Sequence, residues 1–363
     1  GSSGDAELVA AAFVGLWAGM NYEQMTSVFR VEERSVAFVA ASIANILLTV
    51  GATLVLVVAL EQGPLGVIVG NFTGTLLVYT ALLGARREQL GLQLDRSLLR
   101  EMNRFGIPLM PTALFLWTTN FSDRLFLVQL ADVREVGLYS VGVRIASAIV
   151  LVLTAFRLAW PAFAYSIEDD REARRTYAFV LTYLVALTTW VATGLALLSP
   201  WIVDWLAAPA FETASRVVGP LAFSTVAFAG YVVVAIGVGR AKRTQFNWVV
   251  TGAAAAVNVA LNLLLIPRYG MMGAAVATIA AYGTMFAAMA WWAQRIFPVP
   301  YQWRRVGTAA GAGIALAVAG KLVGAGLPLA LGLALAYPLL LLPLGFYLPA
   351  ERRAIGARLR LAR

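Results

Sequence analysis

Long apolar runs alternate along the chain with short stretches that carry most of its charged residues. A hydrocarbon core of about 30 Å requires a helix of roughly 20 predominantly apolar residues. On that criterion the pattern predicts about eleven transmembrane helices, over residues 7–29, 36–60, 63–85, 106–131, 135–160, 176–199, 217–239, 245–266, 270–293, 305–324 and 326–348. The chain is therefore predicted to be an all-α polytopic membrane protein.

The composition agrees with this fold class and excludes several kinds of chemistry. Hydrophobic residues make up 60% of the chain and charged residues 13%, whereas a soluble domain carries roughly 25% charged residues. The chain has no His and no Cys, which excludes a His-based catalytic triad and a His/Cys zinc site. It also lacks a P-loop motif for ATP hydrolysis. We therefore expect the protein to be a transporter, without a cofactor and without enzyme activity.

The basic residues predict the orientation of the helices. They gather in every second connection and in the C-terminal tail, as at Arg86, Arg174, Lys242, Arg304 and Arg352. The positive-inside rule places these segments and the C-terminus in the cytoplasm. Because the net charge of +9 follows this membrane topology, we expect no nucleic-acid partner. The opposite connections hold few basic residues, namely Arg134, Arg216, Arg268 and Lys321.

The connection at residues 86–104 has a pattern of its own. Arg96, Arg100 and Arg104 recur every four residues, with Leu98 and Met102 on another face. This pattern is typical of a short amphipathic helix at the cytoplasmic membrane surface. A solvated, charged connector fits it equally well.

A short motif occurs twice and indicates an internal repeat. Residues 63–66 read Gly-Pro-Leu-Gly and residues 270–273 read Gly-Met-Met-Gly, each with small residues a turn later and a basic connection before the preceding span. The motif alone is weak, because small residues are common at helix crossings in membranes. With the matching connections, it predicts that the helices of 7–85 repeat those of 217–293 in the same orientation.

The repeat predicts a domain organisation with two parallel six-helix lobes and a site between them. We expect the second half of the N-terminal lobe at 1–85, an amphipathic linker at 86–104, the C-terminal lobe at 105–295, and two additional helices with a basic tail at 296–363. The first three helices of the N-terminal lobe would then precede this chain, in a protein of about fourteen spans.

A few polar residues inside the predicted spans are candidates for a site, because a charge in the bilayer costs several kcal/mol. Asp123 and Arg124 lie in the fourth span with Asn120 one turn before them, and Arg144 lies at a similar depth in the fifth. In one interpretation the two arginines form a cationic wall for a diphosphate or acidic sugar, and Asp123 neutralises one of them. In another, Asp123 pairs with Arg144 and only locks two helices together. In a third, the arginines extend to the outer lipid headgroups.

Other polar residues leave similar alternatives. Arg157 either extends from the fifth span to the cytoplasmic headgroups or faces the same cavity as Arg144, which requires a bend in that helix. Glu23 is either a coupling carboxylate or a headgroup-level carboxylate near Arg30. A polar stripe on the eighth span either contacts sugars or makes hydrogen bonds between helices. Its members are Asn247, Thr251, Asn258 and Asn262.

Several stretches also resemble a known family. They are Arg-Phe-Gly-Ile-Pro-Leu-Met-Pro at 104–111, Ser-Asp-Arg at 122–124, Glu-Val-Gly-Leu-Tyr-Ser at 135–140, Ala-Trp-Pro at 159–161, Asn-Leu-Leu-Leu-Ile-Pro at 262–267 and Tyr-Gly-Met-Met-Gly-Ala-Ala at 269–275. Their order and spacing resemble the polysaccharide-biosynthesis flippases of the multidrug/oligosaccharidyl-lipid/polysaccharide exporter superfamily. The resemblance runs over residues 6–295.

The resemblance implies a flippase that moves undecaprenyl-pyrophosphate-linked O-antigen or capsule repeat units across the bacterial inner membrane by alternating access. Its partners would be the lipid-linked oligosaccharide and membrane lipid, and a polysaccharide polymerase is a candidate partner. The candidate substrate-binding residues are Arg124, Arg144, Asp123, Asn120, Arg157, Asn258 and Asn262.

Two other functions compete with this one. A cation-coupled multidrug exporter belongs to the same superfamily. An integral-membrane glycan polymerase would require a large external loop with catalytic groups, and the longest predicted external loop, 199–216, holds only Asp204, Glu212 and Arg216.

Overall fold

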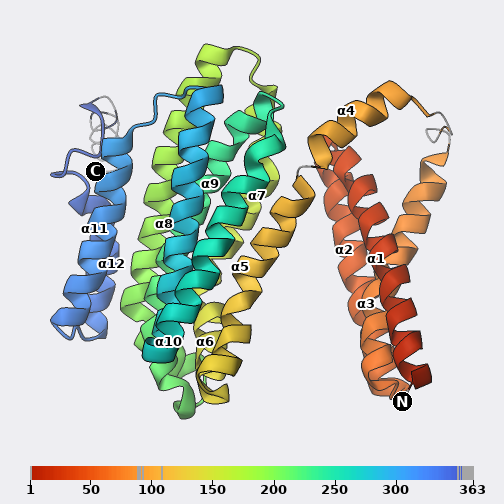
Figure 1. The fold of residues 1–363 in the computed structure, drawn as a ribbon, viewed down its shortest axis with the longest axis horizontal. Helices are drawn as coiled ribbons and strands as arrows, with labels where there is room; N and C mark the ends of the chain where they lie inside the picture. Colours follow the sequence, from red (N-terminus) through yellow and green to blue (C-terminus); the bar gives the residue numbers. More distant parts are fainter. Residues whose placement is uncertain are drawn as a thin grey trace, which may run out of the picture. The chain divides into compact units, whose positions relative to one another are not determined.

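The computed structural model describes residues 2–87, 91, 94–107, 109–349, 351 and 353, and all regular structure in these residues is helical (Figure 1). Short π- or 3-10-helical turns lie at Val55–Ala59, Pro209–Ala214 and Thr244–Phe246. The α-helices are α1 (Ser2–Val31), α2 (Ser35–Leu54), α3 (Gly63–Ala85), α4 (Arg96–Gly106), α5 (Leu109–Leu130), α6 (Val133–Ala146), α7 (Ala148–Ser166), α8 (Asp170–Leu206), α9 (Ser215–Arg240), α10 (Asn247–Ile296), α11 (Trp303–Leu322) and α12 (Leu327–Leu340).

These helices confirm the predicted fold class, because each predicted span contains helix, although the last one, predicted at 326–348, is helical only over Leu327–Leu340. The span predicted at 135–160 is broken into α6 and α7 at Ser147. The spans predicted at 245–266 and 270–293 form two arms of α10, which is kinked at Gly270. Among the described residues, six helical segments are long and apolar enough to cross a membrane by composition alone. The protein is an all-α polytopic membrane protein.

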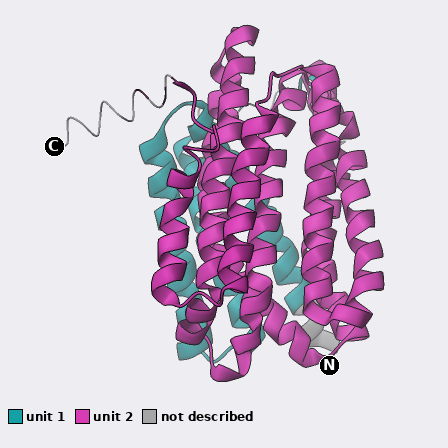
Figure 2. Ribbon diagram, turned by 90° about the vertical axis from the view of Figure 1, so that its left-hand side faces the viewer, with its two compact units in different colours: residues 1–95 teal, residues 96–363 magenta. Residues whose placement is uncertain are grey.

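The chain folds into two compact units, residues 1–95 and 96–363, which are coloured separately in Figure 2. In the first unit, α1 and α2 both pack against α3. Its core is largely aromatic: Tyr22, Phe29 and Tyr79 are buried, and the ring of Trp17 meets that of Tyr79 edge-on at 5.7 Å. The boundary between the units falls in the segment predicted to be a linker.

In the second unit, α9 packs between α8 and α10, and α5 lies along α10 (Figure 1). Its core is continuous and includes the fully buried Tyr177, Met285 and Met289. The helices α11 and α12 pack on α8, where the indole of Trp190 donates a hydrogen bond to the Ala334 carbonyl at 2.8 Å. Large apolar side chains remain exposed on the outside, as expected where a helix faces lipid.

The two Gly-x-x-Gly motifs share an unusual backbone conformation. Gly63 has a φ of 55° and Gly270 a φ of 51°, a left-handed region that glycine adopts without the strain a Cβ brings. The second glycine of each motif packs against the preceding helical segment, so that a Cβ on Gly66 would lie 3.1 Å from the Leu56 carbonyl oxygen and one on Gly273 would lie 2.6 Å from that of Leu265. This similarity favours the predicted repeat, which stays a prediction.

Parts of three predicted segments lie outside the described residues. In the predicted linker, residues 88–90, 92 and 93 are not described, and α4 begins in the remainder. In the span predicted at 106–131 residue 108 is not described, and in the predicted basic tail residues 350, 352 and 354–363 are not described.

Candidate functional site

The centre of the second unit holds a buried carboxylate surrounded by neutral donors. Asp123, on α5, is 3% exposed. Its Oδ2 accepts hydrogen bonds from the hydroxyls of Tyr139 at 2.5 Å and Thr278 at 2.7 Å. Its Oδ1 accepts from the side-chain amides of Asn262 at 2.7 Å and Asn258 at 3.2 Å. We call these five residues, which come from α5, α6 and both arms of α10, the Asp123 cluster.

The amides of the cluster are themselves only partly satisfied. The Oδ1 of Asn258 accepts from the Ser122 hydroxyl at 2.7 Å and from the Asn262 amide at 3.1 Å. The Oδ1 of Asn262 is buried and has no hydrogen-bond partner among the described residues. An unsatisfied buried acceptor costs about 1–3 kcal/mol. The cluster therefore has a free oxygen that a donor or a cation would stabilise.

The kink in α10 assembles the cluster. The first arm carries Asn258 and Asn262, and the second carries Thr278. Glu135, at the start of α6, accepts a hydrogen bond from the Met271 backbone N–H at 2.7 Å. A carboxylate is favourable at a helix N-terminus, so Glu135 caps the second arm directly after the positive-φ glycine.

The structure corrects the ion pairs expected for Asp123. In the described part of the chain, no Lys or Arg nitrogen lies within 4.0 Å of its carboxylate. The side chain of Arg144 is exposed, and that of Arg124 is half-buried over the Phe121 ring at 5.6 Å. Adjacent residues point about 100° apart around a helix, so Asp123 faces the donors of α10 while Arg124 faces elsewhere. The predictions that Asp123 neutralises an arginine or pairs with Arg144 are wrong.

A cavity of about 230 Å³ lies beside the cluster. Three of the predicted site residues, Asn120, Asp123 and Arg157, line it together with Tyr139 and Thr278. The wall also includes polar residues of α9 and α10, namely Ser224, Thr225 and Tyr282. Sites for small molecules typically measure about 300–1,000 Å³. This cavity therefore suits one part of a larger ligand.

Arg157 is the cationic group of this cavity. Its guanidinium lies 5.6 Å from the centre of the Phe228 ring, and no carboxylate pairs with it among the described residues. The helix is broken at Ser147, as a cavity shared by Arg144 and Arg157 would require, yet Arg144 and Arg124 are not among the lining residues. Next to the Phe228 ring lies that of Tyr282, with their centres 5.2 Å apart, and Asn120 accepts a hydrogen bond from the Tyr282 hydroxyl at 3.0 Å.

The polar stripe of the eighth predicted span divides into two parts. Asn258 and Asn262 bond to Asp123 across helices, whereas Thr251 bonds to the backbone of its own helix at Asn247. The sequence did not single out Tyr139, Thr278 or Tyr282 as site residues. A threonine hydroxyl in a helix usually bonds to its own backbone, and a tyrosine in an apolar run is commonly a packing residue. Tyr139 and Thr278 did lie in or next to stretches with a recognisable pattern.

The chemistry of the cluster suits a proton or a small cation. The described residues contain no group of three or more His, Cys, Asp or Glu residues. Carboxylate, amide and hydroxyl oxygens are nevertheless the ligands that hard cations prefer. In a membrane interior an ionised carboxylate without a counter-charge is costly, and the hydrogen-bond partners of Asp123 in the described part of the chain are all neutral.

Comparison with protein families assigns the chain. The family model described as polysaccharide biosynthesis protein matches residues 7–216, more than half of the chain. The chain belongs to this family. The match includes α5, α6 and α7, and so Asp123, Tyr139 and Arg157. A search of curated proteins gives no match.

Solved transporter structures share the fold. A crystal structure of a MATE mutant superposes with a TM-score of 0.67 at 11% identity, covering 84% of this chain and 70% of that one. An outward-facing multidrug resistance MATE family transporter of the MOP superfamily superposes with a TM-score of 0.68 at 11% identity, covering 80% of this chain and 68% of that one. The lipid II flippase MurJ, in an inward closed conformation, superposes with a TM-score of 0.66 at 12% identity, covering 92% of this chain and 72% of that one. The resemblance noted in the sequence is thereby confirmed, and the structural neighbours are transporters and flippases rather than enzymes.

Proposed function

We propose that the protein is a flippase that moves undecaprenyl-pyrophosphate-linked oligosaccharide repeat units, such as those of O-antigen or capsule, across the bacterial inner membrane by alternating access. The family and the fold support a transporter of this superfamily. The observation that carries the proposal is that two residues line one cavity: Arg157, which forms no ion pair with a carboxylate among the described residues, and the buried carboxylate Asp123. The basic connections and the C-terminus would face the cytoplasm, near a polysaccharide polymerase.

Arg157 would hold the anionic part of the substrate. A guanidinium donates hydrogen bonds in a planar fork that matches phosphate oxygens. The small volume of the cavity suits a diphosphate or one sugar ring, while the lipid chain stays in the bilayer. Asn120 and Tyr282 offer hydrogen bonds to sugar hydroxyls. Arg124 and Arg144 would contact other parts of the substrate, and this stays a prediction.

Asp123 would couple transport to an ion gradient. Its four hydrogen bonds join α5 to α6 and to both arms of α10. Protonation, or the release of a cation, changes which of these bonds the carboxylate accepts. The packing of α5 against α10 would then differ between the two states, as alternating access requires.

A cation-coupled multidrug exporter is the second candidate. The Asp123 cluster and the similarity to a multidrug resistance transporter favour it. The two candidates differ in cargo. The whole protein, reconstituted in vesicles, should translocate a fluorescent undecaprenyl-pyrophosphate-linked oligosaccharide and should not extrude cationic dyes. Dye extrusion without oligosaccharide movement would replace the flippase proposal by the exporter.

The site is tested by two arginines of the same predicted span. Arg157→Ala should abolish oligosaccharide translocation while the protein still accumulates in the membrane, and Arg157→Lys should restore it only in part, because Lys keeps the charge without the fork. Arg144→Ala is the comparison variant. Because Arg144 lies outside the cavity, a contact that it makes with another part of the substrate should contribute less than Arg157 does. Normal translocation by Arg157→Ala would place the anion site elsewhere.

A further inference from the structure

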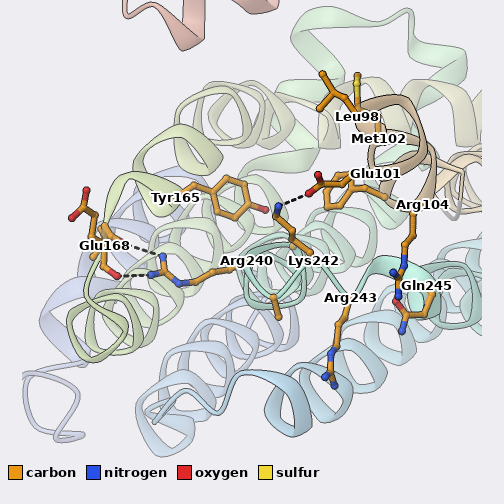
Figure 3. A pocket seen from close by; sticks show the side chains of 14 residues that line it. Leu98, Glu101, Met102, Arg104, Tyr165, Glu168, Arg240, Lys242, Arg243 and Gln245 are labelled. Atoms are coloured by element: carbon orange, nitrogen blue, oxygen red, sulfur yellow. Dashed lines mark hydrogen bonds and ion pairs between the residues drawn. The ribbon is translucent and has the colours of Figure 1, made fainter. Parts of the chain in front are cut away.

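A second cavity of the second unit shares no lining residue with the Asp123 cluster. It measures about 1,100 Å³ and is bounded by α4, the end of α7 and the connection from α9 to α10 (Figure 3). Leu98, Met102 and Phe105 of α4 form an apolar side. The opposite side is basic, with Arg240, Lys242 and Arg243 among its residues. The cavity therefore presents an apolar wall and a cationic wall to the same space.

Specific bonds hold these walls together. The Lys242 ammonium donates to the Glu101 carboxylate at 2.7 Å, as Figure 3 shows. The Thr244 hydroxyl donates to the Phe105 carbonyl at 3.0 Å, which also ties α4 to the α9–α10 connection. The Arg240 guanidinium donates a hydrogen bond to the Asp170 carboxylate at 2.9 Å and further hydrogen bonds to backbone carbonyls. These two basic groups are therefore already neutralised by acids of the protein.

Two further arginines of the cavity form no ion pair with an Asp or Glu of the described residues. They are Arg104 and Arg243, whose side chains are exposed. Arg104 points toward Gln245, whose amide adds a neutral donor at the same wall (Figure 3). Guanidinium and amide N–H groups are donors that phosphate oxygens accept readily.

The position of α4 identifies the kind of molecule that carries the phosphate. Its charged residues Arg96, Arg100 and Arg104 lie apart from Leu98 and Met102, which are 54% and 61% exposed. A helix with such segregated faces lies at a membrane surface with its apolar side among the acyl chains. The mouth of the cavity is then at the level of lipid headgroups.

We propose that this cavity binds one anionic glycerophospholipid, with its phosphate on Arg104 and Arg243 and its acyl chains along Leu98, Met102 and Phe105. A free phosphate ion would fill only a small part of 1,100 Å³ and would leave the apolar wall in contact with water. The site concerns a lipid of the surrounding membrane, so it is independent of the transported substrate and of the Asp123 cluster.

Native mass spectrometry of the purified protein with added lipid tests the proposal. Dioleoyl phosphatidylglycerol should be retained at one molecule per chain, and dioleoyl phosphatidylcholine at least about tenfold more weakly. The pair Arg104→Gln and Arg243→Gln should weaken retention of phosphatidylglycerol about tenfold or more. The pair Arg87→Gln and Arg304→Gln removes the same charge from exposed positions outside the cavity and should leave retention unchanged.

Two further measurements separate a lipid from a free anion. Leu98→Gln with Met102→Gln should also weaken retention of phosphatidylglycerol, and millimolar inorganic phosphate should not displace it. Both helix positions are exposed, so size-exclusion and thermal melting should match the unaltered protein. Equal retention of the two lipids, an equal effect of the control pair, or displacement by phosphate would overturn the proposal.

Discussion

Asp123 in the second unit and Glu32 in the first are both carboxylates with several hydrogen bonds, but their partners differ in charge. Glu32 directly follows α1. Its carboxylate accepts two hydrogen bonds, at 3.0 Å and 2.5 Å, from the guanidinium of Arg86 at the end of α3. That guanidinium also lies over the Phe29 ring at 4.4 Å. Asp123 accepts four hydrogen bonds, all from neutral groups.

The difference separates a structural carboxylate from one suited to exchange. The hydrogen bonds from Arg86 lower the pKa of Glu32, so Glu32 stays ionised and ties the ends of two helices. Neutral donors stabilise a carboxylate without supplying a counter-charge. Among the described residues, Asp123 therefore has hydrogen-bond donors but no counter-charge, and the proposed coupling role rests on this difference from Glu32.

The largest effects are expected at Asp123. Asp123→Ala removes an acceptor that serves four donors, and each unsatisfied buried donor costs about 1–3 kcal/mol, so the protein should fail to accumulate. Asp123→Asn keeps the size of the side chain and should accumulate, yet lose most translocation because an amide cannot exchange a proton. Immunoblotting of membranes and a vesicle assay measure the two quantities. Full translocation by Asp123→Asn would make Asp123 a structural residue like Glu32.

The two positive-φ glycines give the next largest effect. Gly270→Ala places a Cβ about 2.5 Å from the Glu135 carboxylate and adds backbone strain of about 1–2 kcal/mol. Gly63→Ala has a similar φ but nothing within 4 Å of its Cβ, so it carries the strain alone. Thermal melting in detergent should show a larger loss for Gly270→Ala, together with reduced translocation. Equal losses would mean that the Glu135 cap does not stabilise the kink.

A smaller effect is expected at Glu32, and it depends on pH. The pKa of Glu32 in the folded protein is lowered from its ordinary value of 4.5. Its stabilising contribution is therefore complete above that value and disappears as the pH falls through the folded-state pKa. Glu32→Gln should lower the melting temperature at neutral pH and lose part of the acid dependence. The exposed neighbour Glu33→Gln is the control and should behave like the unaltered protein.

The smallest effect is expected for the ion pair between Glu101 and Lys242, because both side chains are largely exposed, at 62% and 74%. The hydrogen bond from Lys242 lowers the pKa of Glu101, but solvent and salt screen exposed pairs. Glu101→Gln should shift the melting temperature slightly at low salt and not at 1 M salt. A large shift that persists in high salt would show that α4 is held mainly by this pair.

The sequence by itself determined the helical architecture. A segment that crosses lipid must be apolar along about 20 residues, and a helix satisfies all the backbone hydrogen bonds of such a segment internally. It also identified Asp123, Asn120, Arg157, Asn258 and Asn262 as unusual, since amides and charges are rare inside such runs. Length and hydropathy set how deep a residue lies in a span. They do not set which neighbour its side chain faces.

Tertiary structure decided those neighbours. The kink at Gly270 lets Thr278 and Asn262 approach one carboxylate, and the face of α5 that meets α10 carries Asp123 and not Arg124. The break at Ser147 begins a new helix that carries Arg157 to the cavity, while Arg144 remains outside it. Hydrogen bonds require distances near 3 Å and a defined direction, and those depend on helix rotation and kink geometry, which the order of residues in a span does not specify.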